Sequence, residues 1–250
     1  SFDVSFGSHS YHADISQADV APRFTAYFVS HPAFFARDFL YGDANGDYPD
    51  NLFRFFFFQS AVVEFIRRRK LIFDVIHCHD WLTMKAAIAV KEKLGVPLVL
   101  TVHSTEYDRS GWIYPNQWFI DIEREGMQKA DRIIAVSEFT KRVIIEKYGI
   151  NPDKITVVHN AVYPIGEGEK RNLILFLGRL TIQKGPEFFL KTAKKVLEYE
   201  DARFVIAGIG DMLPRLIEQA VHLGISNKVI FTGKLTEEEV NLEIANRVKQ

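Results

Sequence analysis

Two positively charged side chains, Arg179 and Lys184, flank a short turn in the second half of the chain. An apolar run ends just before Gly178, and Pro186, a residue favoured in the first turn of a helix, follows two positions after Lys184. A helix N-terminus attracts anions, because the free N–H groups there carry partial positive charge, and cations beside it add to this attraction. A diphosphate suits such a place, and the cations would stabilise the charge that develops when a sugar–diphosphate bond breaks. A surface Arg and Lys without a ligand explain the spacing equally well, so both interpretations stay open.

A second polar run, His-Cys-His-Asp-Trp, occupies residues 77–81, directly after an apolar run. If the strand continues into it, His77 and His79 lie on one face, because side chains alternate along a strand. A His-x-His pair at a strand end holds a divalent ion in many hydrolases. With His103, this makes a metal-dependent hydrolase an alternative. The second half offers no obvious completing ligand, and an ordinary structural role for His77 explains the pattern better.

Gly208 and Gly210 enclose one residue in a turn between an apolar run and an apparent helix. Such a turn can let a nucleotide approach the backbone. A tight strand-to-helix turn accounts for the same two glycines equally well.

Short apolar runs alternate with helical patterns along most of the sequence. The runs are rich in Val, Ile and Leu without polar alternation, which is typical of parallel strands covered on both faces. They predict strands at residues 73–76, 98–102, 132–136, 155–158, 173–177, 204–207 and 229–231. Capping and first-turn residues predict helices at residues 137–149, 186–198 and 212–223. This alternation predicts an α/β protein with two Rossmann-like, doubly wound parallel sheets.

Polar residues follow nearly every predicted strand. In open α/β sheets, ligands bind beyond the carboxyl ends of the strands. The polar segments are residues 77–81, 103–106, 137–138, 159–160, 178–179 and 208–211. Polar clusters at so many strand ends indicate a ligand-binding edge.

Residues 161–169 break the periodicity and carry Pro164 with two glycines, as a linker between domains does. We therefore expect two domains, residues 1–162 and residues 163–250. Both are expected to be incomplete, because the chain begins without Met and stops after a polar, helix-like run at residues 237–250. Residues 31–50 predict a long surface excursion, a feature that is often functional.

The composition excludes several classes of protein. A formal net charge of −1 argues against sequence-independent binding of nucleic acid, and the basic run at residues 67–70 suits the end of a helix. The apolar stretch at residues 55–66 is too short and too interrupted to cross a membrane. Cys78 is the only cysteine, so no internal disulfide can form, and we expect a cytoplasmic protein.

Several of these segments together resemble the glycogen and starch synthases. The run from Gly178 to Pro186 is similar to that family's phosphate-binding stretch almost residue for residue. The His-x-His-Asp-Trp run resembles its strand-end motif in the first domain, and residues 101–104 resemble a Thr-x-His-Asn element in which Ser104 replaces the usual Asn. Residues 34–55 also resemble the family, so the resemblance covers nearly the whole chain.

The resemblance implies a GT-B fold, in which two Rossmann-like domains face each other across a cleft and the second holds most of the donor nucleotide. It implies a retaining glucosyltransferase that moves glucose from ADP-glucose or UDP-glucose to the non-reducing end of an α-1,4-glucan. No metal or other cofactor is implied, which disfavours a zinc site at the histidines. A sibling transferase acting on sucrose, trehalose or lipid acceptors and a non-catalytic glucan-binding fragment are alternatives. The choice of donor nucleotide and the oligomeric state stay open.

The resemblance also implies roles for single residues. Residues expected at the donor are Arg179, Lys184, Gly178, Gly208 and Gly210. His103 is expected to lie against the transferred glucose, and Asp80 to act indirectly by orienting groups near the sugar. Residues expected to bind substrate are His79, Trp81 and Asn160. Ala161 replaces the glycine that follows this Asn in the family, which makes a close backbone approach there doubtful.

Two elements of the family have no counterpart in these residues. A glycine-rich loop that helps to hold acceptor and phosphate would precede Ser1, and paired glutamates that bind the donor would follow Gln250. We therefore expect the isolated chain to have little or no transferase activity.

Overall fold

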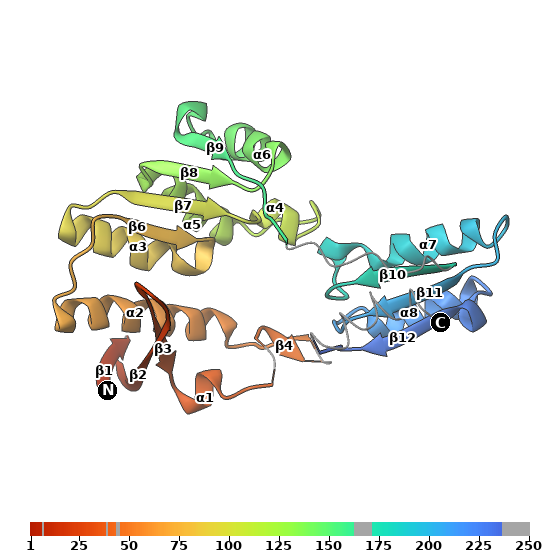
Figure 1. The fold of residues 1–250 in the computed structure, drawn as a ribbon, viewed down its shortest axis with the longest axis horizontal. Coiled ribbons are helices and arrows are strands. Elements are labelled where there is room, and N and C mark those ends of the chain that lie inside the picture. The colour runs from red at the N-terminus through yellow and green to blue at the C-terminus, as the bar shows by residue number, and fades with distance from the viewer. Residues whose placement is uncertain (7, 39, 44–45, 163–171, 237–250) are drawn as a thin grey trace. The chain divides into compact units, whose positions relative to one another are not determined.

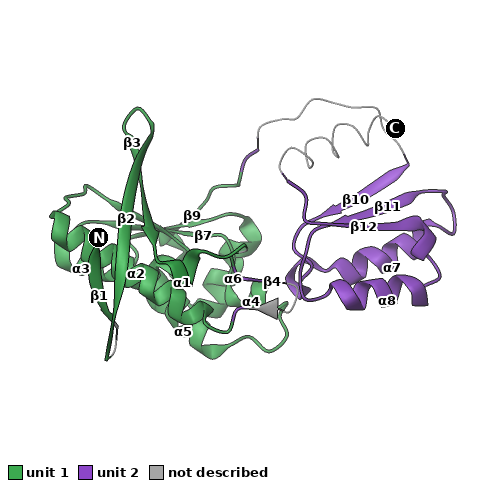
Figure 2. Ribbon diagram, turned by 90° about the horizontal axis from the view of Figure 1, so that it is seen from below, with its two compact units in different colours: residues 1–40, 49–160 green, residues 41–48, 161–250 purple. Residues whose placement is uncertain are grey.

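The computed structural model describes residues 1–6, 8–38, 40–43, 46–162 and 172–236. Contacts between residues group the chain into two units, which are coloured separately in Figure 2. Unit 1 contains residues 1–40 and 49–160, and unit 2 contains residues 41–48 and 161–250. Each unit has its own parallel sheet, as Figure 1 shows.

The parallel sheet of unit 1 has four strands in chain order. They are β6 (Ile76–His79), β7 (Leu98–Val102), β8 (Arg132–Ala135) and β9 (Ile155–Val157). One row of buried side chains crosses all of them: Cys78, Leu100, Ile133 and Ile155. The connecting helices are α3 (Trp81–Leu94), α4 (Glu106–Arg109), α5 (Gln117–Lys129), α6 (Glu138–Tyr148) and the 3₁₀ helix η1 (Pro152–Lys154). The buried row and the apolar faces of these helices form one core.

Helix α6 illustrates how local sequence fixes an element. Its N-cap, Ser137, accepts a hydrogen bond from the Thr140 N–H at 3.0 Å. Gly149 ends the helix with a φ of 69°, a left-handed conformation that glycine adopts without strain. Val143 and Ile144 face the core between these caps. The helix predicted from the two capping residues is confirmed.

The sequence patterns predict no strand or helix in residues 2–30. In the structure, these residues form an antiparallel sheet. Its strands, in the order β1-β2-β3, are β1 (Phe2–Phe6), β2 (His9–Ala21) and β3 (Phe24–Ser30). Helix α2 (Asn51–Arg69) and the short helix α1 (Pro32–Phe35) share a core with it. Lys70, with a φ of 51°, ends α2 directly after three arginines, so the basic run does lie at the end of a helix.

Residues 31–50 contain more regular structure than the predicted excursion. Besides α1, they hold the short antiparallel pair β4 (Gly42–Asp43) and β5 (Gly46–Asp47). The Tyr48 N–H donates to the Tyr41 carbonyl at 2.9 Å and closes this hairpin. Residues 39, 44 and 45 lie outside the described part of the chain.

Unit 2 is built on three parallel strands in the order β10-β11-β12: β10 (Leu173–Leu177), β11 (Arg203–Ala207) and β12 (Val229–Gly233). Its helices are α7 (Pro186–Val196) and α8 (Leu213–His222), with the 3₁₀ helices η2 (Ile182–Lys184) and η3 (Ser226–Lys228). Leu180, Leu190, Leu216 and Ile206 are almost completely buried in the core of this unit.

Most predicted strands and helices of the two parallel sheets are confirmed to within two residues at each end. The strand predicted at residues 73–76 is wrong in position, because β6 covers Ile76–His79. The pairing explains the shift: Ile76 is level with Leu98, where β7 begins, and Cys78 is the buried residue of β6. Residues 163–169 of the predicted linker and the helix-like run at residues 237–250 lie outside the described residues.

None of the helices in the described part of the chain has both the length and the apolar character that a membrane crossing requires.

Candidate functional site

The carboxyl ends of β6 and β7 are tied together by Asp80. Its N–H donates to the Thr101 carbonyl at 3.0 Å, and its Oδ1 accepts from the His103 N–H at 2.7 Å. Asp80 has a φ of 53°, which is uncommon for a residue with a side chain. Such strain persists only where the surroundings fix the backbone, and these two hydrogen bonds do so. The carboxylate of Asp80 therefore holds the backbone of His103.

The surroundings of the Asp80 carboxyl group have opposing effects on its acidity. Burial raises its pKa, because a charged carboxylate loses hydration. The hydrogen bonds from the His103 N–H and the Ser104 N–H oppose this, and so does the charge of Arg109. Burial is the larger effect, so the pKa lies above that of an exposed aspartate.

Three histidines gather at the same strand ends. The rings of His77 and His79 are 4.5 Å apart between centroids, as expected for two residues on one face of a strand. His77 Nε2 is hydrogen-bonded to Thr101 Oγ1 at 2.7 Å, and His79 Nδ1 lies 3.0 Å from His103 Nε2. Burial, followed by repulsion from His77 and His103, lowers the pKa of His79.

This arrangement does not favour the metal-dependent hydrolase. The facing nitrogens of His79 and His103 bond to each other rather than converging on one point, and His77 is bonded to Thr101. Among the residues that the structure describes, no three His, Cys, Asp or Glu side chains are placed to hold a metal ion together.

Neither Trp81 nor Asn160 takes part in the hydrogen bonds or ring contacts that join the three histidines. Trp81 begins α3 and packs edge-on against Phe119, with ring centroids 4.7 Å apart, and against Trp118. Asn160 is exposed and follows β9, which is two strands away from β7 along the same edge. Of the three residues expected to bind substrate, the structure brings only His79 into the histidine cluster.

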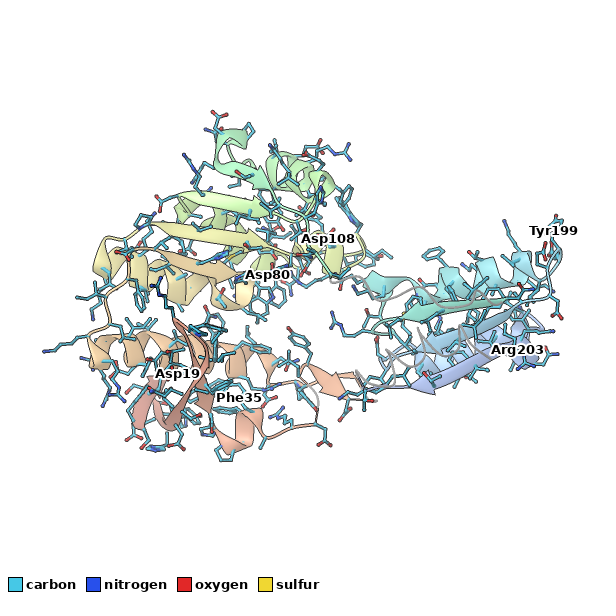
Figure 3. All side chains as sticks on the ribbon, in the orientation of Figure 1. Asp19, Phe35, Asp80, Asp108, Tyr199 and Arg203 are labelled. Carbon is cyan, nitrogen blue, oxygen red and sulfur yellow. The ribbon has the colours of Figure 1, made fainter. Side chains whose placement is uncertain are left out.

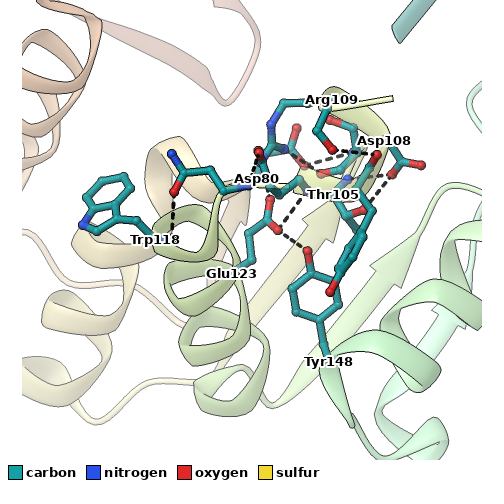
Figure 4. Close-up of polar contacts among 12 residues, drawn as sticks. Asp80, Thr105, Asp108, Arg109, Trp118, Glu123 and Tyr148 are labelled. Atoms are coloured by element: carbon teal, nitrogen blue, oxygen red, sulfur yellow. Dashed lines mark hydrogen bonds and ion pairs between the residues drawn. The ribbon is translucent and has the colours of Figure 1, made fainter. Parts of the chain in front are cut away.

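A buried ionic network, absent from our sequence predictions, holds the segment that follows β7 (Figure 4). Arg109 donates to Glu123 Oε1 at 2.6 Å and to the Ser104 carbonyl at 3.2 Å. The other oxygen of Glu123 accepts from the Glu106 N–H at 3.0 Å and from the Tyr148 hydroxyl. Three of these four hydrogen bonds connect α4, α5 and α6, and the fourth ties α4 to the segment after β7.

The buried position of Glu123 costs desolvation free energy, because the carboxylate loses its hydration. Only 1% of its surface is exposed, and burial raises its pKa although Arg109 opposes the shift. A sequence signal for it exists: Glu123 stands at helical spacing between Ile120 and Met127, which both face the core. A charged residue on an apolar helix face indicates a buried partner.

In unit 2, the loops after β10 and β11 contact each other through their backbones. The Gly178 N–H donates to the Ala207 carbonyl at 3.0 Å, and the Leu180 N–H donates to the Ile209 carbonyl at 2.9 Å. A Cβ built on Gly208 would lie 1.9 Å from the Gly178 oxygen, and one on Gly210 would lie 2.3 Å from the Leu180 oxygen. The tight-turn interpretation therefore accounts for Gly208 and Gly210.

Gly178 differs from these two glycines. The nearest atom to a Cβ placed there is a ring carbon of Phe176 at 3.9 Å, an ordinary contact distance. Packing within the described residues therefore gives no steric reason for a glycine at this position.

Arg179 and Lys184 are exposed and lie on the same strand-end loop, between β10 and α7. The Arg179 guanidinium lies 5.4 Å from the centroid of the Tyr41 ring, within cation–π range. Lys184 ends η2, and Gly185, with a φ of 64°, turns the chain into α7. Glu187 occupies the first turn of α7, so attraction of an anion depends on the two cations more than on the helix end alone.

The comparisons with known proteins agree with this architecture. Residues 1–156 match the family model of the starch synthase catalytic domain, and residues 162–247 match that of glycosyl transferases group 1. The chain is 31% identical over 169 residues to glycogen synthase 2 of Geobacter sulfurreducens, and this alignment covers 58% of this chain and 35% of that protein. It is 33% identical over 181 residues to an uncharacterized glycosyltransferase of Methanocaldococcus jannaschii, which covers 64% of this chain and 46% of that protein. The chain thus spans less than half the length of these relatives.

Solved structures show the same fold. The catalytic domain of starch synthase IV from Arabidopsis thaliana, bound to ADP and acarbose, matches 97% of this chain and 64% of its own, with a TM-score of 0.69 and 16% identity. HepE from Anabaena, in complex with UDP and glucose, matches 75% of this chain and 55% of its own, with a TM-score of 0.60 and 15% identity. The two parallel α/β units are those of a GT-B glycosyltransferase. Within that class, the chain belongs to the starch and glycogen synthase family.

We expect Asp80→Asn to stabilise unit 1 at neutral pH. The amide keeps an oxygen for the His103 N–H and removes a buried charge. The pKa of Asp80 is raised in the folded state, so its charged carboxylate lowers the stability of the fold. This loss of stability is fully present above the raised pKa, and it disappears as the pH falls below the ordinary aspartate range. Urea unfolding followed by tryptophan fluorescence reports on unit 1, which contains Trp81, Trp112 and Trp118. A variant that is less stable than the wild type at pH 7 would contradict the expected sign.

We expect Gly210→Ala to destabilise unit 2, because the new methyl group overlaps the backbone of Leu180. Overpacking of this kind costs about 1–3 kcal/mol. Gly178→Ala is the matched control on the facing loop and is expected to change the free energy of unfolding by less than about 0.5 kcal/mol. Amide hydrogen exchange in β11 measures the free energy of unfolding of unit 2 in both variants. Equal protection in the two variants would show that the loop contact does not explain Gly210.

Proposed function

We propose that the protein containing this chain is a retaining glucosyltransferase that extends an α-1,4-glucan from ADP-glucose or UDP-glucose. Its acceptor is an α-glucan, and its proposed compartment is the cytoplasm. The observation that carries this proposal is the position of Arg179 and Lys184, exposed on the loop that joins the carboxyl end of β10 to α7. This is the edge at which open α/β sheets bind ligands.

Arg179 and Lys184 are proposed to bind the donor diphosphate. Charge develops on the departing nucleotide diphosphate as the bond to glucose breaks, and preorganised cations stabilise that charge without reorganising. Two features support preorganisation of the loop. The buried Leu180 anchors it between the two cations, and the Tyr41 ring lies against the Arg179 guanidinium. Gly178, which packing does not require, leaves room for a phosphate oxygen beside the backbone.

His103 and Asp80 are proposed to act on the sugar side of the donor. The His103 ring is exposed at the carboxyl end of β7, while its N–H is fixed by Asp80 at 2.7 Å. We assign contact with the transferred glucose to the His103 side chain. Asp80 is a positioning residue, because its carboxylate is engaged with the backbone of His103 and Ser104.

Donor binding tests the diphosphate assignment. Arg179→Ala and Lys184→Ala are each expected to weaken binding of ADP-glucose or UDP-glucose by about 10- to 100-fold, because a hydrogen bond to a charged group contributes roughly 1.5–3 kcal/mol. Isothermal titration calorimetry with the nucleotide sugar and with the nucleoside diphosphate alone measures this loss. Both ligands are expected to lose affinity equally, since both carry the diphosphate.

Arg203→Ala is the matched control for these variants. Arg203 is an exposed cation in the same unit, but it begins β11 and so lies at the amino end of the strands (Figure 3). Its removal is expected to leave donor affinity unchanged. Wild-type affinity in Arg179→Ala or Lys184→Ala, or an equal loss in Arg203→Ala, would refute the proposed role of the loop.

A further inference from the structure

His79 and His103 form a direct hydrogen bond between two imidazole rings. Nδ1 of His79 lies 3.0 Å from Nε2 of His103, and the rings are nearly parallel, at 15°, with centroids 5.2 Å apart. A hydrogen bond at this distance needs one nitrogen that carries a proton and one that is bare. The pair therefore cannot be protonated on both facing nitrogens.

The backbones on both sides of this pair are fixed, so the contact is a built feature of the strand ends. The hydroxyl of Thr83, in the first turn of α3, accepts from the His79 N–H at 2.8 Å and donates to the His79 carbonyl at 2.7 Å. On the neighbouring strand, the His103 N–H donates to Asp80 Oδ1 at 2.7 Å. Each ring is thus carried by a backbone that has little freedom to move.

Two neutral arrangements of the pair are possible, and they differ in tautomer. In one, both rings carry their proton on Nε2, so His103 donates and His79 accepts. In the other, both carry it on Nδ1, and the direction is reversed. Neutral histidine in water favours the Nε2–H form, so the first arrangement uses the preferred tautomer of both rings, and the second uses the disfavoured tautomer of both.

Burial, more than the neighbouring charges, disfavours the charged form of His79. Burial lowers the pKa of His79, and His77 on the same strand and His103 on β7 add to this, while Asp80 opposes them. The charge of Arg109, from α4, lowers the pKa of Asp80. A neutral His79 leaves its Nδ1 free to accept.

We propose that His79 is a positioning residue that accepts the His103 Nε2–H and so holds His103 in a single tautomer, with a bare Nδ1. Among the described residues, Nδ1 of His103 makes no hydrogen bond. It is therefore the nitrogen available to accept from a hydroxyl of the transferred sugar, a step that rests on the proposed function. His79 itself then acts through His103 and does not bind the substrate.

Nitrogen NMR of the histidine side chains tests the tautomer without any need for activity. In the chain labelled with ¹⁵N at its eight histidines, His103 is expected to show a protonated Nε2 and a bare Nδ1, and His79 the same pattern. In His79→Phe, which keeps a flat ring without an acceptor, the two His103 nitrogens are expected to move toward averaged shifts. A protonated Nδ1 on His103 in the wild type, or an unchanged His103 in His79→Phe, would overturn the proposal.

Two further variants separate this role from general damage to the fold. His79→Asn places an amide oxygen near the position of Nδ1 and is expected to restore the single tautomer of His103. His77→Phe makes the same substitution two residues away, on a ring bonded to Thr101, and is expected to leave His103 unchanged. Loss of the His103 tautomer in His77→Phe, or no recovery in His79→Asn, would show that packing alone is responsible.

The sugar contact has its own readout. Addition of ADP-glucose or UDP-glucose is expected to shift the His103 Nδ1 signal, and the nucleoside diphosphate alone is expected to leave it in place. A shift with the diphosphate alone, or none with either nucleotide sugar although it binds, would contradict the contact between Nδ1 and sugar. Absence of any binding by the whole protein that contains this chain would contradict the proposed function, while the tautomer result would still decide the role of His79.

Discussion

The ion pair between Arg109 and Glu123 is the interaction on which the strand-end site of unit 1 depends. Its nitrogen and oxygen are 2.6 Å apart, and Glu123 is 1% exposed. The desolvation free energy lost on burying such a pair can exceed the attraction between the two charges. The pair therefore matters here because of the geometry that it imposes. Through the Ser104 carbonyl and the Glu106 N–H, the pair fixes the chain immediately after His103. The cross-tie from Asp80 then fixes His103 itself.

The two units hold their strand ends by different physical means. In unit 1, charged and polar side chains tie neighbouring strands and helices together, and their burial shifts the pKa values of Asp80, His79 and Glu123. In unit 2, backbone contacts between neighbouring loops do this work, and they require glycine at two positions. The first device orients groups suited to hydrogen-bonding a sugar. The second keeps a loop rigid while leaving its two cations exposed to an anion, which is what the proposed transfer from a sugar diphosphate requires.

Sequence reasoning identified the parallel sheets well, because buried strands are apolar runs with clear ends. Strands β7 and β10 were predicted to the residue. The predicted position of strand β6 was wrong because the exposed positions of this strand carry histidines. Its register with β7 shows where it lies. The antiparallel sheet at residues 2–30 was missed, since its strands lack such runs. The roles of Glu123 and Gly210 depend on partners distant in sequence, such as Arg109 and Leu180, so spacing alone cannot supply them.

A double-mutant cycle on the Arg109–Glu123 pair tests the central claim most directly. Urea unfolding of unit 1, followed by tryptophan fluorescence, is measured for Arg109→Met, Glu123→Gln and the two combined. We expect Arg109→Met alone to cost about 3–5 kcal/mol, because it leaves Glu123 buried without a cation. The double variant is expected to be more stable than the sum of the single losses predicts. Single losses below about 1 kcal/mol that simply add would contradict the claim that this pair holds the site in place.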